Sequence, residues 1–214
     1  MPGRFLTDAE RERFTGFPKT IPLEECVTSF TLSPKDLDLV RLLRGGKNRL
    51  GFALQLGSIR YLGFAPDDLT TAPETVVGYV ASQLDVDPVE LIRYGQRAHT
   101  RTDHLQAVLA HLKFRLPTAQ DLDALASWLT ERALEHDSPL VLFTNASDHL
   151  KSLSIIRPGV TVLERLVVAA REAAHQETYR RLESLLTETL LPQLDLLLLV
   201  ILNCVLIYNT KMRE

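Results

Sequence analysis

The hydrophobic and polar positions of the chain repeat at the spacing of α-helices. Apolar residues recur every three or four positions, as in the stripe Leu122, Leu125 and Leu129, and alternating strand patterns are hard to find. Trp128 belongs to the same region, and we expect it in the core with this stripe. The pattern favours an all-α fold.

Helix starts are marked by a capping residue followed three positions later by a carboxylate, because the two side chains together satisfy free amides of the first turn. Pairs with this spacing are Thr7 with Glu10, Asp87 with Glu90, Thr118 with Asp121 and Thr161 with Glu164. Pro34 and Pro88 stand at first helical positions, where a missing N–H is tolerated. These signals predict helices over residues 7–14, 34–44, 47–62, 73–84, 88–95, 100–114, 118–135, 138–152 and 161–190.

The predicted helices suggest tandem three-helix units followed by a bundle. We expect a first helix-turn-helix-like unit over residues 1–70 and a second over residues 71–116. A helical bundle over residues 117–200 would support them or mediate self-association. Residues 201–214 are expected to form an aberrant tail.

Composition limits the kinds of partner the chain can have. Its 214 residues are 45% hydrophobic, enough for a packed core. The net charge of −3 and a pI near 6.1 argue against a uniformly basic surface, so any anion site must be local. Cys26 and Cys204 have neither metal-binding nor redox spacing, and the start carries no signal segment. A cytoplasmic location is therefore expected.

Positive charge gathers in two runs that contain no acid. The first acid-free run, residues 39–66, carries Arg41, Arg44, Lys47, Arg49 and Arg60. The second acid-free run, residues 91–102, carries Arg93, Arg97, His99 and Arg101. Such clusters bind phosphates by releasing condensed counterions. They therefore indicate a nucleic-acid surface.

The geometry predicted around Gly45 and Gly46 is that of a helix-turn-helix motif, whose second helix enters the major groove with its first residues against base edges. Asn and Arg pair bidentately with adenine and guanine. The candidate DNA-binding residues are Arg41, Arg44, Lys47, Asn48, Arg49, Arg60, Arg93, Arg97, His99, Arg101, His104, Lys113 and Arg115. The alternative is that these cations are only solvated or paired with neighbouring acids.

Catalytic and metal-binding patterns are absent from the sequence. The stretch "GGKNRLG" has neither the dinucleotide nor the P-loop spacing, and no nucleophile has a nearby base. His99, His104 and His111 are better explained as surface or groove-facing residues than as metal ligands. The paired acids are expected to cap helices: Asp36 with Asp38, Asp85 with Asp87, and Asp121 with Asp123. We expect no enzyme activity, no catalytic residue, no metal and no cofactor.

The end of the chain, from Leu196 to Tyr208, is almost wholly apolar but shorter than the roughly 20 residues that span a bilayer. A buried terminal helix or strand, or a sequence read out of its proper frame, explains it better than a membrane anchor. No membrane partner is expected.

Several stretches resemble the N-terminal region of the Tn-three family of replicative transposases. In order they are "RFLTDAERERF", "LSPKDLDLV", "NRLGFALQLGSIRYLG", "RYGQRAHTRTDHL" and "RPGVTVLERLV". The resemblance covers about residues 4 to 200. After "LDLLLLV" the chain departs from the family pattern, which suggests a frameshifted or truncated gene.

The resemblance implies a helical DNA-binding fragment that recognises the terminal inverted repeats of a transposon as double-stranded DNA. The family's acidic metal-binding triad would lie beyond the end of this chain, so no catalytic residue is carried over. A homodimer and association with an intact transposase both stay open as partners. The alternative function is a helical protein-interaction module acting through residues 117–200.

Overall fold

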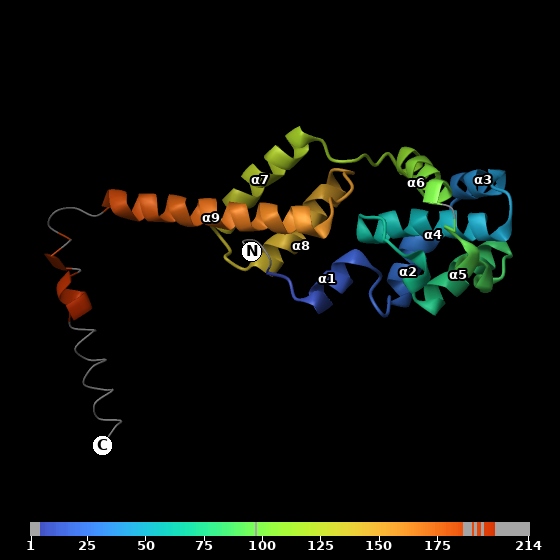
Figure 1. Cartoon of the computed structure of the whole chain (residues 1–214), viewed down its shortest axis with the longest axis horizontal. Helices are drawn as coiled ribbons and strands as arrows, with labels where there is room; N and C mark the ends of the chain where they lie inside the picture. Colours follow the sequence, from blue (N-terminus) through green and yellow to red (C-terminus); the bar gives the residue numbers. More distant parts are fainter. Residues whose placement is uncertain (1–4, 97, 186–189, 191, 194, 200–214) are drawn as a thin grey trace, which may run out of the picture. The chain divides into compact units, whose positions relative to one another are not determined.

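The computed structural model of the chain describes residues 5–96, 98–185, 190, 192, 193 and 195–199 (Figure 1). The regular secondary structure of these residues is helical, apart from one isolated β-bridge between Arg115 and Ile155, so the predicted all-α class is confirmed. The chain divides into two compact units, residues 1–171 and 172–214. The expected tail, residues 201–214, lies outside the described part.

The order of elements follows the prediction with three differences. The elements are α1 (Asp8–Thr15), α2 (Leu23–Phe30), α3 (Pro34–Leu42), α4 (Gly46–Leu62), η1 (Leu69–Thr71), α5 (Glu74–Leu84), η2 (Pro88–Arg93), α6 (Ala98–Leu112), α7 (Ala119–Ala133), α8 (Pro139–Ser152) and α9 (Val160–Leu185). Helix α2 and the short 3₁₀-helix η1 were not predicted. The segment predicted as a helix over residues 88–95 is a 3₁₀-helix.

The capping signals place most helix starts correctly. Thr7 and Thr118 each form a complete capping box with the acid three residues later, and so does Ser33 with Asp36. The prediction for Thr161 and Glu164 is wrong, because α9 already begins at Val160.

Glu164 has a different role, since its side chain is almost fully buried. Its carboxylate accepts a hydrogen bond from the backbone N–H of Leu6 at 3.1 Å and forms an ion pair with Arg11. It thereby fastens the N-terminal segment to α9, across more than 150 residues of sequence.

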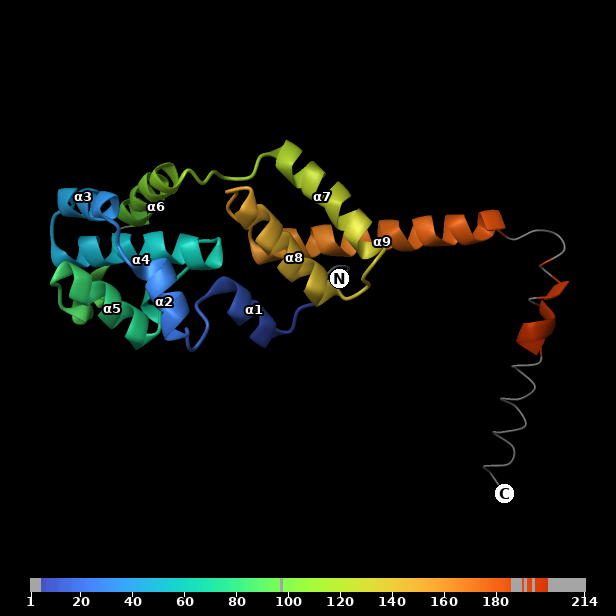
Figure 2. The same cartoon turned by 180° about the vertical axis from the view of Figure 1, so that it is seen from behind.

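Helix α4 is the centre of the core. Figures 1 and 2 show it among α2, α3, α5 and α6, and it also contacts η2. Every residue from Leu50 to Ile59 is buried. The hydrophobic core around it runs continuously from Phe17 to Leu109 and includes Ile156. Residues on both sides of the boundary expected at residue 70 therefore share one core.

Two glycines of α4 let neighbouring rings approach its backbone. A Cβ atom at Gly51 would lie 2.2 Å from the ring of Tyr94, and one at Gly57 would lie 2.2 Å from the ring of Phe30. Protein interiors are close-packed, so neither ring has room to retreat freely. The glycines of "NRLGFALQLG" thus fix how η2 and α2 pack on α4.

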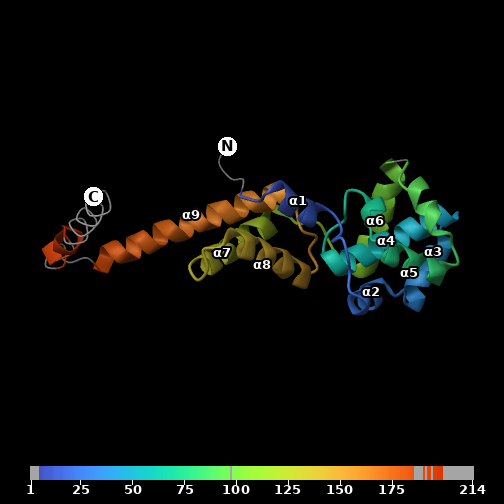
Figure 3. The ribbon, with the colours of Figure 1, turned by 90° about the horizontal axis from the view of Figure 1, so that it is seen from below.

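Helices α7 and α8 pack together and lie beside the first half of α9 (Figure 3). Leu125 and Leu129 are buried as predicted, whereas Trp128 is half-buried and stacks on His149 with ring centroids 4.2 Å apart. The link after α8 is tied to the rest of the first unit. Ile156 N–H donates to the carbonyl of Arg115 at 2.9 Å.

The second unit contains the C-terminal part of α9, in which ion pairs link neighbouring turns. Glu177 accepts hydrogen bonds from Arg180 at 2.9 Å and from Arg181 at 2.7 Å. These bonds lower the pKa of Glu177 to about 2. No helix within the described residues is long and apolar enough to cross a membrane.

Candidate nucleic-acid interface

The turn between α3 and α4 has the predicted helix-turn-helix connectivity. It ends at Gly45, whose φ of 83° lies in the left-handed region that favours glycine. Two side chains of α4 donate hydrogen bonds to backbone carbonyls of the turn. Asn48 Nδ2 donates to the carbonyl of Arg44 at 2.9 Å, and Arg49 Nε donates to the carbonyl of Leu43 at 3.0 Å. Polar groups predicted to meet bases therefore also hold the end of α3 against the start of α4.

A second turn, between η2 and α6, carries the second acid-free run. It passes through Gly95, which has a φ of 75°. The start of α6 is held in place by α4 and by the loop before η1. Gln55 Nε2 donates to the carbonyl of Arg101 at 3.3 Å, and the Arg101 guanidinium donates to the carbonyl of Asp67.

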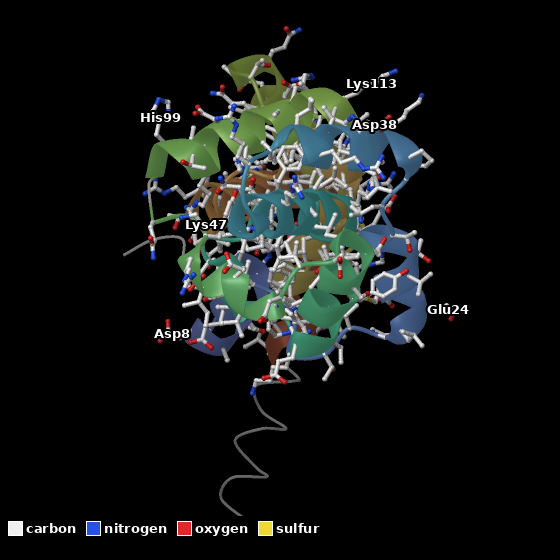
Figure 4. All side chains as sticks on the ribbon, turned by 90° about the vertical axis from the view of Figure 1, so that its right-hand side faces the viewer. Asp8, Glu24, Asp38, Lys47, His99 and Lys113 are labelled. Atoms are coloured by element: carbon white, nitrogen blue, oxygen red, sulfur yellow. The ribbon has the colours of Figure 1, made fainter. Side chains whose placement is uncertain are left out.

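The two acid-free runs meet in a surface pocket of about 300 Å³. Its lining residues are Lys47, Asn48, Arg93, Gly95, Gln96 and Thr100. Lys47 and Asn48 lie in the first turn of α4. The other lining residues come from the end of η2, the turn after it and the start of α6. In Figure 4, Lys47 and His99 lie toward the same side of this end of the molecule. Packing thus joins cations that the sequence separates by more than 40 residues.

The cations around this pocket are only weakly neutralised. Lys47 makes no ion pair within the described part of the chain. Arg93 pairs with Glu90 at 3.3 Å, and the Arg93 side chain is 67% exposed. His99 pairs with Asp103 at 3.1 Å and is also largely exposed. Exposed pairs of this kind contribute little and are screened by salt.

Arg41 and Arg44 belong to the first acid-free run but do not line the pocket. Arg41 lies exposed at the end of α3, where its guanidinium is 3.6 Å from the carboxylate of Asp38. Arg44 is exposed in the turn that follows. Arg97, predicted from the second run, lies outside the described residues.

Arg60 differs from the predicted DNA-binding role, because its guanidinium is bonded to a buried carboxylate. Its guanidinium contacts both oxygens of Asp36 at 2.9 Å, and Asp36 is fully buried. The same carboxylate lies 2.6 Å from His111 Nε2 and accepts the N–H of Ser33 at 2.7 Å. Burial raises the pKa of Asp36, but the hydrogen bonds from His111, Ser33 and Arg60 outweigh it and leave the pKa below its ordinary value. Arg60 therefore joins α3, α4 and α6 in place of reaching outward.

His104 is a second correction. It is buried, with its ring edge-on to Phe52 at 5.4 Å between centroids and its Nδ1 3.0 Å from the hydroxyl of Tyr94. Burial lowers the pKa of His104 and raises that of Tyr94, which favours a neutral ring beside a protonated hydroxyl. A groove-facing position was expected from the basic neighbours, but the residue lies on the inner face of α6.

Lys113 and Arg115 follow the far end of α6. Figure 4 shows Lys113 on the other side of this end of the molecule from Lys47 and His99. Arg115 is occupied by Asp121, with 2.7 Å between Nη2 and Oδ1. The pair raises the pKa of Arg115 and lowers that of Asp121. These two residues do not belong to the pocket.

The arrangement suits anion binding better than catalysis or metal binding. Among the described residues no group of three or more His, Cys, Asp or Glu side chains could hold a metal ion. The pocket lining contains no carboxylate and no aromatic ring. Sequence reasoning missed Gln96 and Thr100 because it searched the second run for charge. Their position between Arg93 and Arg101 was the available signal.

Comparison with known proteins gives the chain its relatives. Residues 5–170 match the family described as "Domain of unknown function (DUF4158)". The chain is 35% identical over 199 residues to the transposase for transposon Tn501 of Pseudomonas aeruginosa, covering 92% of this chain and 20% of that protein. It is 34% identical over 184 residues to the transposase for transposon Tn1546 of Enterococcus faecium, covering 85% of this chain and 18% of that protein.

A third relative, the transposase for transposon gamma-delta of Escherichia coli, is 30% identical over 86% of this chain and 19% of its own length. The chain thus spans about a fifth of the length of the curated relatives that it matches. The chain belongs to the DUF4158 family, and its relatives are transposases of the Tn-three family.

Proposed function

We propose that the chain binds double-stranded DNA and recognises the terminal inverted repeats of a transposon, without cutting or joining strands itself. The observation that carries the proposal is the pocket in which both acid-free runs meet. The relatives support it, because they are transposases, and recognition of the terminal repeats is what the family resemblance implies. The proposed contacts at the pocket are Lys47, Asn48 and Arg93. Further proposed contacts are Arg44, Arg49, His99 and Arg101, and Arg97, outside the described residues, stays a prediction.

The two units expected over residues 1–70 and 71–116 are proposed to form two halves of one DNA-binding surface. Residues of both halves belong to one hydrophobic core, so the halves are held in register. Two sets of phosphate contacts at a fixed separation bind more tightly than either set alone. Arg41, Lys113 and Arg115 stay predictions that the pocket does not support.

An electrophoretic mobility shift tests the proposal. One duplex carries the terminal inverted repeat of the transposon that encodes the chain, and a second has the same composition in scrambled order. Specific recognition predicts about 1,000-fold tighter binding to the repeat at a stated salt concentration. Equal affinity for the two duplexes would contradict repeat recognition, and binding to neither would contradict DNA binding.

A second function, protein association through residues 117–200, is favoured by the surface between α7 and α8. There Trp128 is stacked on His149 beside a surface pocket, with the guanidinium of Arg132 5.5 Å from the Trp128 ring centroid. Aromatic residues and Arg are enriched at interfaces. Light scattering of the whole chain and of W128A tests it: a concentration-dependent dimer that W128A weakens supports it, and a monomer at all concentrations rules out self-association.

A further inference from the structure

We propose that the pocket between the starts of α4 and α6 seats one phosphate group of the DNA backbone, and that Glu90 is the internal counter-ion which this phosphate displaces from Arg93. The inference rests on the proposed function, because it says how the same site engages its ligand. The inference separates two roles: the pocket positions the duplex through a phosphate, and other residues contact the base edges.

The lining of the pocket is matched to a phosphate. Lys47 and Arg93 supply charge, while Gln96 and Thr100 supply an amide and a hydroxyl that can donate. A flipped or unstacked base would need an aromatic or apolar surface to stack on. The lining contains no aromatic ring and is mostly polar, and a phosphate needs only donors and positive charge.

The backbone around the pocket adds donors without adding carboxylates. Helix α4 begins after Gly45, which has no side chain to cap it, and its first turn contains no acid. The backbone N–H of Asn48 donates to the carbonyl of Gly45. The amides of Gly46 and Lys47 precede it in a first turn, where helices leave N–H groups without helical partners. These amides reinforce the two cations.

Glu90 stands at the edge of this site. Its carboxylate is 3.3 Å from Arg93, and its Cγ would lie 3.5 Å from a Cβ atom built at Gly46. The acid therefore lies beside both the first turn of α4 and the guanidinium that lines the pocket. Because the pair is exposed and weak, a phosphate can take over Arg93 and release Glu90 to solvent.

The test is a salt series of duplex binding with the whole chain, measured by fluorescence anisotropy on the repeat and on the scrambled duplex. The variants are K47A, R93A and E90Q. Matched controls are R180A and E177Q, which remove the same charges from an ion pair 2.9 Å apart in the C-terminal part of α9. Circular dichroism and melting confirm that each variant is folded before its binding is compared.

Loss of one phosphate contact lowers the slope of log affinity against log salt by about 0.9, which is about eightfold in affinity at 0.1 M salt. We expect this for K47A and for R93A on both duplexes, with the ratio of repeat to scrambled affinity unchanged. E90Q should bind up to about fivefold more tightly, since no ion pair has to be broken. R180A and E177Q should match the unchanged chain.

Other results would distinguish a failure of the phosphate seat from a failure of the proposed function. If K47A and R93A lose repeat preference but keep the salt slope, the pocket reads a base. If neither quantity changes although the unchanged chain prefers the repeat, DNA binds elsewhere on the protein. If the unchanged chain binds without preference but the slopes change as expected, the seat stands and repeat recognition fails. Binding to neither duplex removes both.

Discussion

His104 shows at the scale of a single residue how burial decides what a histidine can do. The residue lies among basic neighbours, yet its ring is enclosed by Phe52 and Tyr94. The neutral ring fits there because its Nδ1 can accept the hydroxyl of Tyr94. The nearby charge of Asp103 opposes the effect of burial, but the pKa of His104 remains below its ordinary value.

The lowered pKa of His104 predicts acid sensitivity with a definite sign. The unfolded chain binds a proton at this residue near pH 6.5, while the folded chain does so only at lower pH. The free energy of unfolding therefore falls as the pH drops below about 6.5. In H104F, which loses about 1 kcal/mol because Tyr94 has no acceptor, this part of the pH dependence disappears.

Urea unfolding at pH 7 and pH 5 measures the effect. H99Q is the control, because it removes a histidine whose side chain is 88% exposed. The same change in unfolding free energy between the two pH values for H104F and for the unchanged chain would contradict the assignment.

The residue scale also marks the limit of sequence reasoning. Arg60 and Arg93 look alike in the sequence, since both stand in acid-free runs. Arg60 is nevertheless bound to a buried carboxylate 24 positions earlier, and Arg93 faces solvent. That difference depends on which side of each helix meets the core, and no local pattern contains it.

At the scale of elements, the sequence predicts helices that carry local capping signals, but it misses a helix that depends on tertiary packing. The capping boxes at Thr7 and Thr118 are complete within four residues, so the sequence could locate α1 and α7. Helix α2 follows Pro22 and has no side-chain cap, so no capping signal in the sequence predicts it. Its stability comes from burying Cys26 and Phe30 against α4, which only the tertiary structure provides.

Helix α4 yields a prediction about its glycines. Alanine is the better helix former by about 1 kcal/mol. Gly51→Ala and Gly57→Ala should nevertheless each destabilise the fold by about 1–3 kcal/mol, because the added carbon meets a buried ring. Gly78→Ala in α5, where nothing lies within 4 Å, should stabilise by about 0.4–1 kcal/mol. Thermal melts of the three variants compare them.

If Gly51→Ala and Gly57→Ala were as stable as Gly78→Ala, the close approach of Tyr94 and Phe30 to α4 would be wrong. A melt cannot separate a shifted ring from a shifted helix. Retained near-ultraviolet circular dichroism in the variants would indicate that the aromatic packing has adjusted locally.

At the scale of the whole molecule, Glu164 connects the segment of Leu6 and Arg11 to helix α9. It is bonded to Leu6 and Arg11 and is 1% exposed. Removing one partner of a buried ion pair costs about 3–5 kcal/mol, because the other charge is left without compensation. Glu164→Gln should therefore loosen the segment around α1 more than any other part of the first unit.

Hydrogen exchange followed by mass spectrometry measures this loosening as faster exchange in peptides that contain residues 5–15. Glu177→Gln is the control on the same helix, because Glu177 pairs with the exposed Arg180 and Arg181 of the next turn. Equal exchange of residues 5–15 in the two variants would contradict a clamping role for Glu164.

The shared core beneath the two acid-free runs has a mechanical consequence. Because α4 packs against both η2 and α6, the cations at its start and those that follow η2 cannot change their separation without unpacking the interior. A duplex bound across them must present its phosphates at that one spacing. The cost of any mismatch then falls on the DNA, so sequences that twist or bend easily would gain an advantage at base pairs which the protein never touches.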